Sequence, residues 1–211
     1  FMDFYAESEP EYAALAAHIR DIIPEEHQRY NWTWFFYPFL LTNIDKAPPP
    51  KGPSDDSLNA RHFETLGQVF MRSGTGPDDS YSLFTIGSRV KSHKQFDENN
   101  FIIYRNGWLA LDSGTRGRST SYQLRHYYAQ TVAHNCMLIH MPGEPFPAYW
   151  GLAYDGPEGE INHGGMNRTT GGICTAFETN GHYSYVAGDA SACYHHGKCE
   201  CALRQYVFVY P

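Results

Sequence analysis

The sequence predicts a mainly β protein, an antiparallel β-sandwich preceded by helices. Aromatic residues make up 16% of the 211 residues, and Tyr and Phe, which favour strands, account for most of them. The 19 Gly and 13 Pro residues interrupt the chain often, as turns between short strands require. After a proline-rich segment at residues 46–57, the spacing of apolar residues changes from helical to alternating. Short strand-like segments then follow closely, which is typical of a sandwich.

Two helices are expected before the proline-rich segment. In residues 8–23, Ser8 is a suitable N-cap, Pro10 lies in the first turn, and apolar residues recur at helical spacing. Residues 30–41 are rich in aromatic residues and have no polar face wide enough for a free-standing surface helix. Because two such helices cannot bury themselves, we expect them to belong to a larger helical domain.

These features divide the chain into three parts. Residues 1–45 are predicted to end a helical domain, residues 46–66 to form a linker, and residues 67–211 to form the antiparallel sandwich. The chain begins at Phe1 without a leader and stops at Pro211, directly after a strand-like run. We therefore expect an internal piece of a longer protein.

The strongest local signal in the sandwich region is a hairpin over residues 101–112. Asn106 and Gly107 separate two apolar segments and favour the positive φ angles of a type I′ turn. The remaining strands are predicted at residues 68–72, 81–86, 132–139, 172–178, 182–187 and 204–210.

Cysteine usage and apolar runs exclude several protein classes. No apolar run approaches the roughly 20 residues that a membrane-spanning helix needs. The five cysteines are irregularly spaced, so no disulfide scaffold is predicted. A zinc cluster could be formed by Cys193, His195, His196, Cys199 and Cys201, but this spacing is unlike that of structural zinc sites. A loop with free or locally paired thiols is the favoured interpretation.

Basic residues are concentrated in one stretch of an acidic protein. Residues 88–125 hold seven Lys or Arg against three Asp or Glu, a net charge of +4, whereas the whole chain carries −7. Such a stretch indicates a local anionic ligand, with a chance cluster on a solvated face as the alternative.

Three segments in this region and beyond it occur together in a known family. They are SHKQFDENNF at residues 92–101, LALDSG at 109–114 and TVAHNCMLI at 131–139. They resemble the HxHxDxxxF, LALDSG and AHN segments of heparinase II/III-type polysaccharide lyases, heparinase II in particular. The resemblance covers residues 67–210, and it implies that the first 45 residues are the last helices of the family's α/α toroid.

The resemblance implies a lyase that cleaves uronic-acid-containing, glycosaminoglycan-like chains such as heparin or heparan sulfate by β-elimination. That reaction removes the proton beside a neutralised carboxylate and protonates the departing glycosidic oxygen. His93 corresponds to the family's catalytic histidine, and the alternative is a surface loop histidine. The family's catalytic Tyr and its neutralising His or Asn would precede Phe1, so this piece alone is expected to be inactive.

The family also has a structural divalent metal, and its ligands correspond to Gln95, Asp112 and His134. Zinc fits Asp112 and His134, but Gln95 replaces a histidine. The site could therefore be weakened, use another residue such as His126, or hold a harder ion such as calcium. Without a metal, Asp112 would cap a turn and His134 would be a core histidine.

The anionic polysaccharide is the expected partner, bound by the basic residues Arg89, Lys91 and Lys94. A homodimer is a further partner considered, while nucleic acid is not expected because the protein is acidic and lacks a recognition motif. The resemblance implies a periplasmic or secreted bacterial protein. Two other functions stay open: a non-catalytic carbohydrate-binding sandwich, and a uronyl C5-epimerase, which would share the proton-abstraction step.

Overall fold

A computed structural model of the chain describes residues 9–22, 49, 51–52, 59–90, 93–113, 122–149 and 159–210. The chain forms two compact units, Phe1–Ser57 and Leu58–Pro211. The boundary between them falls within the segment that the sequence predicts as a linker.

The first unit contains the helix α2, Pro10–Ile22. Pro10 occupies its first position, where a missing N–H costs nothing, and Glu11 places a negative charge in the first turn. Ala13, Ala14 and Ala17 are buried on one side. The predicted first helix is therefore confirmed over these residues. The predicted second helix lies outside the described residues, and membership of an α/α toroid stays a prediction.

The second unit begins with a five-stranded antiparallel sheet in the order β1-β2-β3-β4-β5. Each strand pairs with the next one along the chain, so the sheet is a simple meander. Its strands are β1 Ala60–Phe63, β2 Gln68–Arg72, β3 Tyr81–Thr85, β4 Asn100–Tyr104 and β5 Trp108–Ala110.

A three-stranded antiparallel sheet follows in the order β6-β7-β8. Its strands are β6 Ile173–Thr179, β7 Tyr183–Asp189 and β8 Leu203–Val209. Along β8, exposed and half-buried residues alternate strictly, as they do when one face of a strand packs inward.

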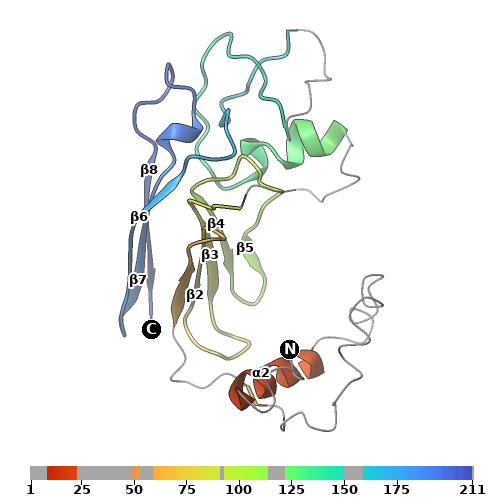
Figure 1. The fold of residues 1–211 in the computed structure, drawn as a ribbon, viewed down its shortest axis with the longest axis vertical. Coiled ribbons are helices and arrows are strands. Elements are labelled where there is room, and N and C mark those ends of the chain that lie inside the picture. The colour runs from red at the N-terminus through yellow and green to blue at the C-terminus, as the bar shows by residue number, and fades with distance from the viewer. Residues whose placement is uncertain are drawn as a thin grey trace. The chain divides into compact units, whose positions relative to one another are not determined.

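The two sheets pack face to face, with the three-stranded sheet in blue beside the five-stranded sheet in orange to green (Figure 1). The Tyr206 ring of β8 lies 5.6 Å from the rings of both Phe84 and Phe101. Its hydroxyl lies 2.7 Å from Ser82 Oγ, which satisfies both polar groups between the sheets. Val69 and Val186 complete the middle of the core. The predicted antiparallel sandwich is confirmed.

The β4–β5 hairpin has the predicted turn residues, with φ of 51° at Asn106 and 142° at Gly107. The turn is one residue longer than a type I′ turn, because Tyr104 pairs with Trp108 and the register shifts at Ile103 and Tyr104. Strand structure also begins earlier than predicted, since β1 falls inside the range assigned to the linker.

The strand predicted at residues 132–139 is wrong. Thr131–Ala133 form a single turn of 3-10 helix, and the chain then runs on without strand pairing. Hydrogen bonds with neighbouring loops, and not with another strand, satisfy the polar groups of this segment. The Thr131 hydroxyl accepts from Met166 N at 2.8 Å, and Ile139 N donates to Gly164 O at 2.8 Å. With these partners the segment needs no neighbouring strand.

A search of the described residues finds no helix that is both long and apolar enough to cross a membrane.

Candidate functional site

The loop that leads into β4 is held by a buried ion pair. Lys94 Nζ lies 2.5 Å from Glu98 Oε1, and their side chains are 7% and 1% exposed. The second carboxylate oxygen of Glu98 accepts from Gly87 N at 2.6 Å, and Lys94 Nζ also donates to Ser88 O. Both carboxylate oxygens therefore have partners. These contacts fix the loop to the residues that come shortly after β3.

Asn99 attaches the same loop to the three-stranded sheet. Its backbone has a φ of 65°, a conformation that Asn tolerates better than most residues. The side-chain amide donates to Gly188 O at 3.2 Å and to Ala202 O at 3.0 Å. It lies so close to β7 that a side chain at Gly188 would collide with it. Arg204 Nη1 adds hydrogen bonds to Asn99 O at 2.6 Å and Asn135 O at 2.5 Å.

Asn100 brings the second and third sequence motifs together. Its Nδ2 donates to Asp112 Oδ1 at 2.9 Å, while its Oδ1 accepts from Asn135 N at 2.9 Å. Asn135 Nδ2 also donates to Phe101 O at 2.8 Å. The backbone after Asp112 is fixed as well, because Ser113 N donates to Ala133 O at 2.8 Å. His134, between Ala133 and Asn135, is thereby positioned beside Asp112.

Asp112 and His134 form a close pair without a hydrogen bond. Asp112 Oδ2 lies 3.1 Å from His134 Nδ1, and the two side chains are 26% and 1% exposed. Among the described residues, neither imidazole nitrogen of His134 has a hydrogen-bond partner, since the approach of Oδ2 lacks the required direction. Buried polar atoms without partners are costly and uncommon in folded proteins. The pair therefore has spare capacity to bind a ligand.

This spare capacity fits a divalent cation. An imidazole nitrogen and a carboxylate oxygen are both ligands for zinc and for related ions. The described residues contain no three His, Cys, Asp or Glu side chains close enough together to hold a metal. A third ligand from the described residues would have to be of another type, such as the amide of Gln95. Gln95 is half-buried, and no hydrogen bond involves its side chain in the described structure.

Asp97 has no role predicted from the sequence, although it is the aspartate of the first motif. Burial raises the pKa of its carboxyl, the charge of His134 opposes that rise, and Glu98 adds to it. The carboxyl thus lies in the electrostatic neighbourhood of the Asp112–His134 pair. The signal that could have identified it is the aspartate at the end of the HxHxD pattern.

His93 lies on the exposed part of the loop, next to the buried Lys94. Its φ of 59° is uncommon for a residue other than glycine. Strained backbone of this kind is found more often at functional sites than elsewhere. The ion pair of Lys94 with Glu98 holds the loop one residue beyond this position, which restricts where the imidazole can lie.

The three predicted substrate-binding cations are in different surroundings. Arg89 is 75% exposed and lies 3.8 Å from the exposed carboxylate of Glu64, a contact too weak in water to withhold it from an anion. Lys91 lies outside the described residues. Lys94 is buried against Glu98, so the geometry assigns it to holding the loop and not to the predicted contact with substrate.

The alternative metal ligands are also in other surroundings. His126, on the π-helix η2 (Leu124–Tyr128), stacks on Tyr122 at 3.9 Å and on Phe146 at 5.0 Å. Its Nδ1 lies 3.6 Å from Glu160 Oε2, so it belongs to an aromatic cluster with a carboxylate partner. All five cysteines are free thiols, and burial raises the pKa of Cys193 to about 12.

No protein-family model matches the sequence, and a search of curated proteins finds no match either. Solved structures do resemble it. A heparinase III with methylated lysines has a TM-score of 0.53 at 18% identity, over 84% of this chain and 24% of that one. A mutant of heparan sulfate lyase HepC from Pedobacter heparinus has a TM-score of 0.50 at 15% identity, over 100% of this chain and 26% of that one.

The chain spans about a quarter of the length of these two structures. The likeness is to heparinase III and HepC, and the particular similarity to heparinase II that the motifs suggested stays a prediction. At these identities a structural likeness reports the fold. The chain therefore has the fold of part of a heparinase-type lyase, including its β-sandwich.

Proposed function

We propose that the chain is part of a polysaccharide lyase that cleaves uronic-acid-containing, glycosaminoglycan-like chains by β-elimination. The observation that carries the proposal is the Asp112–His134 pair, in which His134 is buried and neither of its imidazole nitrogens has a hydrogen-bond partner among the described residues. It occurs on a fold shared with two enzymes whose names specify heparin or heparan sulfate. Such an enzyme would meet its substrate in the periplasm or outside the cell.

In this proposal His93 exchanges a proton with the substrate. Imidazole side chains do so near neutral pH, and His93 is exposed on a loop that the buried part of the site restrains. Arg89 and Lys91 would attract the polyanion towards His93, because both precede it closely in the basic stretch. The remaining catalytic groups would come from parts of the protein outside this chain.

A divalent cation would bind Asp112 and His134, with Gln95 as the expected third ligand. When bound, it would supply positive charge that compensates Asp112 and satisfies an imidazole nitrogen of His134. Asn100 would support the cation site, since its side chain hydrogen-bonds to Asp112 and to the backbone N–H of Asn135. The role of the site would be to stabilise the connection between the loop that carries His93 and the segment that carries His134.

The proposal is tested with the full-length protein and the variant His93→Ala. Loss of a group that transfers protons lowers the rate by about 10²–10⁴-fold. The rate is measured by the ultraviolet absorbance of the unsaturated uronate product on several uronate polymers. His182→Ala is the matched control, because His182 is an exposed histidine in the turn before β7.

An unchanged rate in His93→Ala would exclude the catalytic role. The same assay distinguishes the two alternative functions. Binding of the polymer without any product from wild type would indicate a non-catalytic carbohydrate-binding protein. Exchange of the C5 proton with solvent deuterium, without chain cleavage, would indicate an epimerase.

A further inference from the structure

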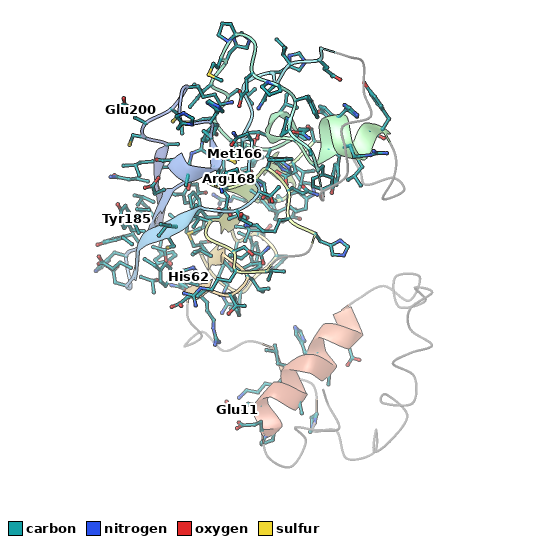
Figure 2. The ribbon with its side chains drawn as sticks, turned by 45° about the horizontal axis from the view of Figure 1, so that its top comes forward. Glu11, His62, Met166, Arg168, Tyr185 and Glu200 are labelled. Atoms are coloured by element: carbon teal, nitrogen blue, oxygen red, sulfur yellow. The ribbon has the colours of Figure 1, made fainter. Side chains whose placement is uncertain are left out.

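A surface depression lies apart from the Asp112–His134 pair. It lies between the loop after Met166 and the loop that joins β7 to β8. Its volume is about 700 Å³, and Asn167, Arg168, His195, His196 and Glu200 are among the residues that line it. We call it the Arg168 pocket. Figure 2 labels Arg168 and Glu200. None of the residues predicted from the sequence motifs for catalysis, substrate binding or metal binding lines it.

The walls of the Arg168 pocket are held together by hydrogen bonds. Cys193 O accepts from both Asn167 N at 2.9 Å and Arg168 N at 3.1 Å, so it fixes one loop to the other. The Tyr194 hydroxyl donates to Met137 O at 2.6 Å, and Ser191 Oγ accepts from Ala202 N at 2.8 Å. The lining side chains therefore extend from a backbone that is already in place before any ligand binds.

The donors in the pocket favour an anionic group. The Arg168 guanidinium carries a permanent charge and matches the planar geometry of a carboxylate or sulfate. His195 and His196 stack with ring centroids 4.5 Å apart and offer further N–H groups. Among the described lining residues only Glu200 is acidic, and it is exposed.

A metal ion is a poorer match to the same residues. Cys199 and the two histidines lie at this pocket, yet the described part of the chain contains no group of three metal-ligating His, Cys, Asp or Glu side chains. The positive charge of Arg168 would also repel a cation.

We propose that the Arg168 pocket is an accessory binding site for one anionic sugar unit, sulfated or carboxylated. The identity of the polymer rests on the proposed lyase function, but binding at the pocket does not require catalysis. A site of this kind would retain one part of a polysaccharide chain while another part occupies the catalytic site, and so raise the effective concentration of substrate.

The test measures binding of an unsaturated sulfated disaccharide to the full-length protein by ligand-observed nuclear magnetic resonance. Because β-elimination has already occurred in this molecule, no cleavage accompanies binding. Arg168→Ala should weaken binding by about 10-fold or more, the effect of losing a charge-assisted hydrogen bond. His196→Ala should weaken it by a smaller factor, and it gives a second readout if Arg168→Ala fails to fold. Thermal unfolding checks the folding of each variant.

Arg105→Ala is the matched control, since it removes the same charge from an exposed position in the β4–β5 turn. It should change binding by less than about twofold. Equal weakening by Arg105→Ala and Arg168→Ala would mean unspecific charge attraction and would overturn the proposal. The proposal is also overturned if wild type does not bind the disaccharide, or if Arg168→Ala binds it as tightly as wild type does. Because the disaccharide cannot be cleaved, these results are independent of the His93→Ala rate.

Discussion

Two pairs of ionisable side chains, Lys94–Glu98 and Asp112–His134, lie close together in the same part of the sandwich and differ in how completely they are hydrogen-bonded. In the Lys94–Glu98 pair, both carboxylate oxygens accept hydrogen bonds, one of them from the ammonium group. In the Asp112–His134 pair, the described residues form a hydrogen bond only with the oxygen facing Asn100, and with neither imidazole nitrogen. A completely satisfied pair needs nothing further, whereas an incompletely satisfied one can bind a ligand. The first pair therefore holds the fold, and the second is the candidate site.

The largest effect expected from this difference is on stability. Glu98→Ala leaves the buried ammonium group of Lys94 without its counter-charge and the Gly87 N–H without its acceptor. Breaking a buried pair on one side costs about 3–5 kcal/mol in the free energy of unfolding. Urea unfolding measures the loss. Glu64→Ala is the control, since its ion pair with Arg89 is exposed and should contribute about 0.5 kcal/mol or less.

A smaller effect is expected at the second pair when no divalent cation is present. Asp112→Ala removes one hydrogen bond from Asn100 and a contact with His134 that is not hydrogen-bonded. The expected loss is about 1 kcal/mol, measured by the same urea unfolding with a chelator present. If Asp112→Ala and Glu98→Ala cost the same, the distinction between a structural pair and a ligand-binding pair is wrong.

The sequence predicts best where local chemistry determines the structure. Asn106 and Gly107 specify the turn of the β4–β5 hairpin, because both residues adopt positive φ at low cost, and the structure has the hairpin there. The sequence predicts the structure poorly where contacts between distant parts of the chain determine the conformation. Residues 131–139 have the composition of a strand, but hydrogen bonds with Asn100, Met166 and Gly164 hold the segment in another conformation.

The candidate site shows the same limit. The motifs identify Asp112 and His134, which the structure brings within 3.1 Å of each other. They do not reveal that Asn100 and Arg204 position the pair, because these residues act through side-chain contacts with segments distant in sequence. Nor do they show that Lys94 is buried, since a lysine in a basic stretch is usually solvated.

Metal analysis of the purified full-length protein tests the central claim most directly. Mass spectrometry of wild type and Asp112→Ala, purified in parallel, gives the metal content of each, and Glu64→Ala serves as the control for loss of an exposed carboxylate. We expect about one divalent ion per chain in wild type and in Glu64→Ala, and a large loss of that ion in Asp112→Ala. Absence of metal from all three proteins, or an equal content in wild type and Asp112→Ala, would contradict the assignment of the Asp112–His134 pair as a cation site.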